Sequence, residues 1–296
     1  MSLYLPSRGS NLRGQHGERI MDIKYAALAM MATLAISGGV SQEAQAQIRE
    51  RSLKKTVMIV LTHGDDLASI APLPAKYAAE GHAVYYVIFT GLQGAVGEPG
   101  SKGHDELLCA SRELGIKENF VLRGPDGVGH ETVAAVAARM IELINQTKTD
   151  VIVTWGPDGL TGHPRHILVG NVVTRVFQQQ ALLKHRPRKL YYIAYPETRF
   201  PDKNLPFGGI YAKVPLGTVS DSFITTTVDA RRYLDRSRKA IACHTIPTVT
   251  VRGPKTEISF DQDWNHRTGT ILEGKVFLRL VMPAARGRET DIFKGL

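Results

Sequence analysis

Apolar runs alternate with amphipathic stretches along most of the chain beyond residue 55. Three of the runs predict buried strands, at residues 56–61, 83–89 and 150–155, and a short strand is predicted at residues 119–122. The segments between and after them carry apolar side chains at helical spacing, which predicts helices at residues 71–80, 104–114, 131–145 and about 164–183. Regular alternation of strands and helices predicts an α/β fold with a doubly wound, mostly parallel sheet.

The alternation becomes irregular in the last third of the chain. Strands are predicted at residues 189–195, 223–228 and 276–281, with one helix at residues 230–244. No linker-like composition separates this part from the preceding alternation. It is therefore expected to be a C-terminal elaboration that closes over the sheet within one domain.

The N-terminal segment has the layout of a signal peptide. Lys24 precedes an apolar run at residues 25–36, and the small-residue pattern Ala44-Gln45-Ala46 follows. The run is short and alanine-rich compared with a membrane span, so no stable membrane anchor is expected. We expect a signal peptide at residues 1–46, with Met21 as a plausible true start, and one mature domain at residues 47–296. A periplasmic or secreted protein follows; an ordinary N-terminal helix and an uncleaved anchor are the alternatives.

Composition and charge add few constraints. The chain of 296 residues is 43% hydrophobic, and its formal net charge of +9 is dispersed along the sequence. Neither zinc-finger spacing nor a basic motif interleaved with aromatic residues occurs, so nucleic acid is not an expected partner. Cys109 and Cys243 could pair in an oxidising compartment, but the sequence does not set their distance. Buried unpaired thiols are the expectation.

Two polar motifs follow predicted strands. His63-Gly-Asp65-Asp66 comes after the first strand, and His163-Pro-Arg-His166 comes shortly after the fourth. The first strand is not followed by the glycine triplet of a dinucleotide fold, so a nucleotide cofactor is not expected. The glycine-rich segment at residues 90–100 follows the second strand and is either a wall of the same crevice or a flexible surface loop.

The two motifs have the composition of a catalytic metal site. The His-x-x-Asp spacing of His63 and Asp66 allows both side chains to face one point in a turn. A third ligand is available from His163 or His166, since their strand should lie near the first. Two histidines and one carboxylate would leave a coordination position for water, as in catalytic zinc sites.

These residues resemble a known family. The segment from His63 to Leu67 is similar to the A-H-P-D-D-E motif of the PIG-L/LmbE-like zinc-dependent de-N-acetylases, and the segment from Gly162 to His166 is similar to their G-H-P-D-H motif. Weaker similarities lie in the helix from Glu106 to Gly115, at Pro157-Asp-Gly159, and between Arg238 and Thr245. The resemblance covers about residues 56–245, in the order of the family.

The resemblance implies roles for individual residues. His63, Asp66 and His166 would hold one Zn²⁺ per chain, or another divalent metal. Asp65 would be the general base that takes the proton of the attacking water. His163 would stabilise the oxyanion or protonate the departing amine, although a loop histidine bonded to backbone is the alternative. His244 is either a residue behind the site or a histidine that caps the end of its helix.

The chain departs from the family pattern at four positions. Gly64 replaces a proline, Leu67 replaces a glutamate, and Thr161 stands where some members carry a tyrosine. Arg165 replaces the aspartate between the two histidines, where it would repel a protonated His163 or contact an anionic group of the substrate.

The expected function is that of an exported, zinc-dependent hydrolase. Its substrate would be a small molecule or glycan that contains an amino sugar, from which it removes an N-acyl group, acetyl in the first instance. The resemblance implies this substrate class. A degenerate family member that binds a sugar or a metal without turnover is the alternative, because Gly64, Leu67 and Arg165 depart from the family pattern.

Overall fold

The computed structural model describes the backbone of residues 54–89, 100–122, 130–199, 217–244, 247–252, 255–260 and 274–296. Within these ranges, side chains are described except at residues 130–132, 161, 247–252 and 255–260. The predicted signal peptide lies outside the described residues, as does the predicted glycine-rich loop apart from Gly100.

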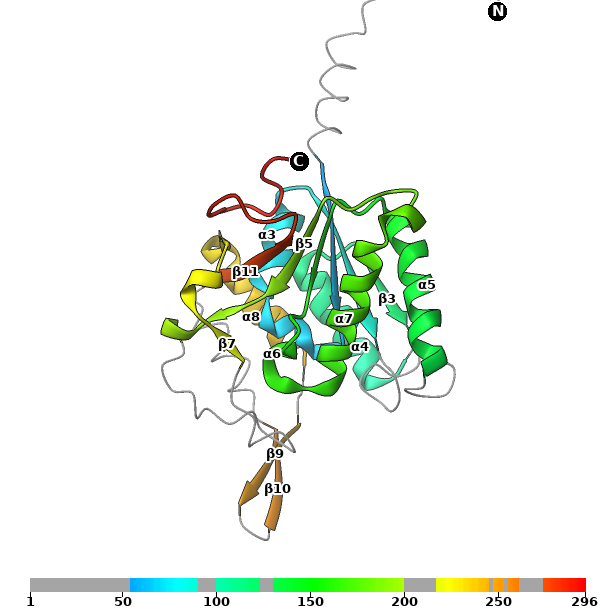
Figure 1. Cartoon of the computed structure of the whole chain (residues 1–296). Helices are drawn as coiled ribbons and strands as arrows, with labels where there is room; N and C mark the ends of the chain where they lie inside the picture. The colour runs from blue at the N-terminus through cyan, green and yellow to red at the C-terminus, as the bar shows by residue number, and fades with distance from the viewer. Residues whose placement is uncertain are drawn as a thin grey trace, which may run out of the picture. The chain divides into compact units, whose positions relative to one another are not determined.

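A seven-stranded sheet forms the centre of the described part of the chain, in the order β3-β2-β1-β4-β5-β11-β8 (Figure 1). Its first five strands are parallel: β1 (Thr56–Leu61), β2 (Ala83–Phe89), β3 (Glu118–Leu122), β4 (Val151–Thr154) and β5 (Lys189–Ile193). Val57 of β1 pairs with both Val84 and Val151, and all three are fully buried. The prediction of a doubly wound, mostly parallel α/β sheet is confirmed.

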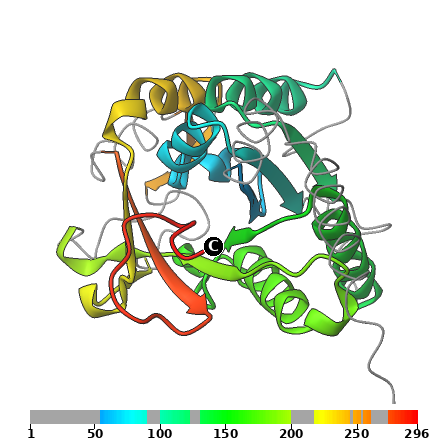
Figure 2. The same cartoon turned by 90° about the horizontal axis from the view of Figure 1, so that it is seen from above.

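Helices form a layer on each face of the sheet (Figures 1 and 2). One layer contains α3 (Pro72–Ala79), α4 (Lys102–Leu114) and α8 (Leu234–Ala242), which pack against one another. The other contains α5 (His130–Thr147) and α7 (Pro164–Gln178). The helix predicted at 164–183 ends at Gln178, and a short 3-10 turn, η2 (Gln180–Leu182), follows it. In the part of the chain that the structure describes, no helix combines the length and apolarity that crossing a membrane requires.

The C-terminal elaboration extends the sheet with antiparallel strands. β11 (Lys275–Met282) lies between β5 and β8 (Thr226–Asp229) and is antiparallel to both. The strand predicted at 189–195 is divided, because β6 (Tyr195–Pro196) pairs with β7 (Thr218–Val219) in a separate sheet. The hairpin of β9 (Pro247–Arg252) and β10 (Lys255–Phe260) was not predicted.

The predicted boundaries around β8 and α8 differ from the structure. The strand expected from Phe223 begins three residues later, because Phe223 belongs to the 3-10 turn η4 (Asp221–Phe223). Its ring is 49% exposed and lies under the Arg279 guanidinium, so its apolar character does not report a buried strand position. The helix expected at 230–244 consists of a 3-10 turn, η5 (Arg231–Tyr233), followed by α8.

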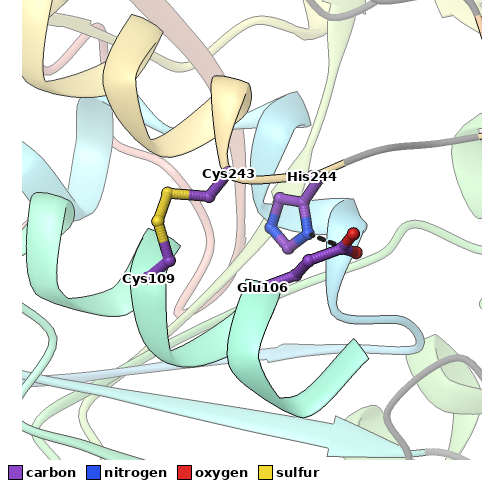
Figure 3. Close-up of a disulfide and its surroundings, with 4 residues drawn as sticks. All are labelled: Glu106, Cys109, Cys243 and His244. Atoms are coloured by element: carbon purple, nitrogen blue, oxygen red, sulfur yellow. Dashed lines mark ion pairs between the residues drawn. A yellow bond between two sulfur atoms is a disulfide. The ribbon is translucent and has the colours of Figure 1, made fainter. Parts of the chain in front are cut away.

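The expectation of unpaired cysteine thiols is wrong. Cys109 of α4 and Cys243, directly after α8, form a disulfide with a Cα–Cα distance of 5.8 Å (Figure 3). The two residues are 134 positions apart in sequence. Their proximity follows from the packing of α8 along α4, which the spacing of apolar residues within either helix does not specify.

Candidate metal centre

The two polar motifs meet at the carboxyl ends of β1 and β4. These strands are direct neighbours, and the chain order reverses between them, which is where open α/β sheets place their ligands. β1 leads into the 3-10 turn η1 (Asp65–Ser69), and β4 leads into α6 (Gly159–Gly162) and then α7. The predicted meeting of the two motifs at one sheet edge is therefore present in the fold.

Three side chains bring potential metal ligands together here: His63, Asp66 and His166. The Nε2 atom of His166 lies 3.4 Å from Nδ1 of His63 and 3.4 Å from Oδ1 of Asp66. Nδ1 of His63 lies 3.5 Å from the other Asp66 oxygen, Oδ2, and one donor atom from each of the three residues lies within 4.8 Å of the other two. Bonds of 2.0–2.1 Å in a tetrahedral zinc site place donors about 3.3 Å apart. The spacing and the His₂-carboxylate chemistry therefore fit a zinc ion with a coordination position left for a further ligand.

Backbone groups hold the Asp66 carboxylate in place. The amides of Thr62 and His63 donate to its Oδ2 atom at 3.0 and 2.7 Å. Thr62 is fully buried and in turn accepts a hydrogen bond from Trp155 Nε1 at 3.2 Å. Because Oδ2 receives both amides, the other carboxylate oxygen faces His166. The short turn after β1 thus presents one oxygen atom to the metal position.

The imidazole of His166 is oriented by contacts on its other side. Its Nδ1 atom donates to the Gly159 carbonyl at 3.0 Å, which leaves the lone pair on Nε2 facing the metal position. The ring stacks on Trp155 with centroids 4.3 Å apart and an interplanar angle of 4°. Gly170 permits the close approach of α7 to the backbone of Trp155, because a Cβ atom there would lie 2.6 Å from the Trp155 carbonyl oxygen.

The turn that supplies the Gly159 carbonyl has an unusual backbone. Gly159 has φ +63°, and a Cβ atom there would lie 2.9 Å from the Cβ of His166. Leu160 follows with φ 60° and ψ −40°, a conformation that residues with a side chain rarely adopt. Its side chain is 2% exposed and its carbonyl accepts the Gly217 amide at 2.5 Å. Burial and this hydrogen bond hold the turn against its strain.

Comparison with known proteins finds a family match over part of the chain. Residues 58–177 match PIG-L, described as GlcNAc-PI de-N-acetylase. This segment, which contains both polar motifs, matches the PIG-L family. Relatives named 1D-myo-inositol 2-acetamido-2-deoxy-alpha-D-glucopyranoside deacetylase include one from Acidothermus cellulolyticus, which is 27% identical over 82% of this chain and 95% of its own length. Another, from Thermomonospora curvata, is 28% identical over 82% of this chain and 97% of its own length.

Solved structures share the fold of this chain. The N,N'-diacetylchitobiose deacetylase of Pyrococcus horikoshii has a TM-score of 0.50 and 14% identity, and covers 90% of this chain and 95% of its own. GalB of Pseudomonas putida, a 4-carboxy-2-hydroxymuconate hydratase, has a TM-score of 0.52 and 13% identity, and covers 77% of this chain and 97% of its own. Proteins with different reactions thus share the architecture, so the fold alone does not select one. The family and the named relatives confirm the predicted class, a hydrolytic de-N-acetylase.

The two adjacent acids of the PIG-L motif differ in their protonation chemistry. Burial, together with the Asp66 carboxylate, raises the pKa of Asp65 above its usual range, against the opposing effect of His63 and His244. Burial also acts to raise the pKa of Asp66, but its interactions with His166 and His63 hold that pKa well below its usual range. Asp66 is therefore the permanent anion, while Asp65 is the acid better suited to exchange a proton.

His163 lies beside the metal position and, among the described residues, is not one of the three donors brought together. Its Nδ1 accepts the Arg165 amide at 3.1 Å, and its ring stacks on His166 with centroids 4.7 Å apart. Burial and the neighbouring imidazoles lower the pKa of His163 to about 4. It is therefore neutral at pH 7 with its proton on Nε2, which makes it a hydrogen-bond donor.

The remaining predicted residues lie around this centre. His244 is 5% exposed, and its charge interactions include Asp65 and Glu106. Arg165 is half-buried at the start of α7, where its charge acts to lower the pKa of both His63 and His163. The side chain of Thr161 lies outside the described part of the site.

Sequence reasoning missed the supporting role of Trp155 and of Tyr86, whose hydroxyl donates to the His63 carbonyl. Trp155 at the end of a predicted strand, just before the second motif, was the available signal. Tyr86 lies within an apolar run, and only the strand pairing places it beside the site. The roles assigned to His63, Asp65, Asp66, His163 and His166 remain predictions.

Proposed function

We propose that this protein is an exported, zinc-dependent hydrolase of the PIG-L family, which removes an acetyl group from the nitrogen of an amino-sugar substrate. The observation that carries the proposal is the set of donor atoms on His63, Asp66 and His166, which lie within 4.8 Å of one another, with a second carboxylate, Asp65, next to Asp66 in sequence. The names of the relatives support an N-acetylated amino sugar as the substrate.

Each residue has a task in amide hydrolysis that suits its surroundings. A zinc ion held by His63, Asp66 and His166 would polarise the amide carbonyl and activate water at neutral pH. Asp65, whose pKa is raised by burial and by Asp66, accepts the proton of the attacking water. His163 donates from Nε2 to the oxygen that becomes negative when the carbonyl is attacked.

Neutral His163 agrees with the presence of Arg165 at the position where the family has aspartate. A carboxylate there would favour the protonated imidazole, whereas the arginine charge acts to lower the pKa of His163. In this chain His163 therefore begins the reaction as a neutral hydrogen-bond donor and not as a protonated acid. The substitution is compatible with turnover and alters how the histidine assists it.

Two features support export. The N-terminal sequence has the layout of a signal peptide, and disulfides such as Cys109–Cys243 persist mainly in oxidising compartments. N-terminal sequencing of the protein from the periplasm or medium tests this part of the proposal. Mature material is expected to begin near Gln47, and material that still begins at Met1 or Met21 would contradict it.

The activity is tested by metal analysis and by turnover on the same preparation. The purified protein is expected to contain about one zinc ion per chain and to release acetate from a panel of N-acetylglucosamine-containing glycosides. A chelator should abolish turnover, and added zinc should restore it. Bound zinc without acetate release across the panel would instead favour a binding protein.

A further inference from the structure

A disulfide joins the two helices beside the metal-binding turn. Cys109 lies in α4, one helical turn after Glu106, and Cys243 lies directly before His244 at the end of α8. Figure 3 shows Glu106 and His244 on the same side of this bond, facing each other. The disulfide therefore joins α4 and α8 close to the facing side chains of Glu106 and His244.

His244 is a buried histidine whose surroundings are only partly polar. Its Nδ1 atom lies 3.9 Å from Oε2 of Glu106, a charge contact longer than a hydrogen bond. Its Nε2 atom is buried, and among the described residues it has no hydrogen-bond partner. A buried polar atom of this kind is costly for a fold unless it has a function or binds a further molecule.

The same imidazole borders the metal-binding turn. His244 shares a small apolar contact region with Leu67 and Ala68 of η1, the turn that begins with Asp65 and Asp66. α8 packs on η1, and Asp65 is among the charged groups that act on His244. His244 is therefore placed to set the position of Asp65, the proposed base, from the side where α4 and α8 meet.

The end of α8 is held by the disulfide, by apolar packing on α4 and η1, and by hydrogen bonds within its own last turn. The amides of Cys243 and His244 bond back to the carbonyls of Ala240 and Ile241, at 3.2 and 3.1 Å, within the last turn. Away from His244, α8 also has a polar connection to α4, the bond from Arg236 Nε to the Glu113 carbonyl, at 2.8 Å, two helical turns earlier. Because helix ends fray readily, the bond at Cys243 restrains the helix end that carries His244.

We propose that the Cys109–Cys243 disulfide is a covalent support of the active site, which holds His244 against Glu106 and thereby positions Asp65. The proposal rests on the proposed hydrolase function. His244 is a positioning residue, since it acts through Asp65. Reduction of the disulfide is expected to lower turnover and to leave the metal in place, because His63, Asp66 and His166 are held by turns that follow β1 and β4.

Reduction has a defined chemistry. A water-soluble phosphine attacks one sulfur, the S–S bond breaks, and water supplies the oxygen of the phosphine oxide and the two protons of the new thiols. The disulfide gains two electrons and the phosphine loses them. A phosphine is preferred to a dithiol reagent, since thiolates are themselves zinc ligands.

The experiment compares wild type before and after phosphine treatment with the double variant Cys109→Ser/Cys243→Ser. The reduced protein and the double variant are both expected to show kcat lowered about tenfold, with KM and zinc content unchanged. Arg236→Met is the matched control, because it removes a polar connection between α4 and α8 that lies away from His244. It is expected to lower the melting temperature and to keep the wild-type kcat.

Substitution of His244 separates a polar role from packing. Phe fills a similar volume without ring nitrogens, so His244→Phe is expected to lower kcat about 10- to 100-fold, the usual range for residues behind a metal site. His244→Gln keeps a polar nitrogen and should retain more of kcat than the Phe variant. Equal kcat in both variants and wild type would overturn the positioning role.

Two further outcomes overturn the proposal. One is an unchanged kcat in the reduced protein and the double Ser variant, with only the melting temperature lowered. The other is a kcat loss in Arg236→Met as large as in the double Ser variant, which would indicate general loosening. If oxidised wild type releases no acetate, the proposed function fails, and hydrogen exchange decides the inference. Faster exchange at residues 65–69 and 241–244 after reduction supports it, and unchanged exchange refutes it.

Discussion

Asp66→Asn is the substitution whose effect follows most directly from the geometry of the site. In the wild type, Oδ2 of Asp66 accepts the amides of Thr62 and His63 at 3.0 and 2.7 Å, and Oδ1 faces His166. Asparagine has one oxygen for these two tasks. If the oxygen keeps the backbone amides, the NH₂ group occupies the ligand position, where it cannot bind a metal.

The opposite orientation is equally unfavourable. The side-chain oxygen then reaches the metal, but the NH₂ group faces two amide donors and both lose their acceptor in a buried turn. Hydrogen bonds to a charged group contribute about 1.5–3 kcal/mol each, so two of them amount to about 3–6 kcal/mol. At about 1.4 kcal/mol per factor of ten, zinc affinity should fall about 10²- to 10⁴-fold.

Zinc affinity is measured by competition with a chromophoric chelator, and the control is Asp65→Asn. The Asp65 carboxylate interacts with its own backbone amide, whereas the Asp66 carboxylate accepts the amides of Thr62 and His63. The control should therefore bind zinc far more tightly than Asp66→Asn, while kcat falls about 10²- to 10⁴-fold through loss of the base. Wild-type affinity in Asp66→Asn, or a larger loss in the control, would refute the division of roles.

Three further predictions concern stability. Lys189 is buried and pairs with Glu289 at 3.0 Å, so Glu289→Gln should lower the free energy of unfolding in urea by about 3–5 kcal/mol. The double variant Lys189→Met/Glu289→Leu should recover most of this loss. A loss under 1 kcal/mol in Glu289→Gln would contradict the prediction. Gly170→Ala should lower the melting temperature and the zinc affinity together, since its Cβ would lie 2.6 Å from the Trp155 carbonyl oxygen. If both the melting temperature and the zinc affinity were unchanged, α7 would be able to shift without cost. Burial raises the pKa of Tyr195 well above its usual range. Its contribution to the free energy of unfolding is therefore complete below the unfolded-state pKa of about 10, and is lost by about 1.4 kcal/mol per pH unit as pH rises towards the folded-state pKa. The free energy of unfolding of Tyr195→Phe should fall less steeply with alkaline pH than that of the wild type, and an identical slope would count against this.

Much of the fold was predictable because its strands are buried on both faces. The residues of β1, β2 and β4 form continuous apolar runs whose length and composition indicate parallel strands. Polar residues at the ends of these runs are then expected at one sheet edge. The boundaries around β8 were less predictable, because an exposed ring such as Phe223 has the same apolar character as a buried one.

The sequence by itself determined which residues are candidate ligands of the metal site. His63 and Asp66 lie within a single turn, so their closeness is a local property of the chain, and the motif containing His163 and His166 supplies the third candidate. Tertiary structure decided between these two histidines, because the Gly159 carbonyl and the Trp155 ring orient His166 towards the other donors.

Tertiary structure alone also decided the pairing of Cys109 with Cys243, against the sequence-based expectation of free thiols. Periodicity reports which face of one helix is buried, and it carries no information on which other helix covers that face. The distance between two side chains 134 residues apart depends on how α4 and α8 pack. The environment of His244 is therefore a property of the assembled fold.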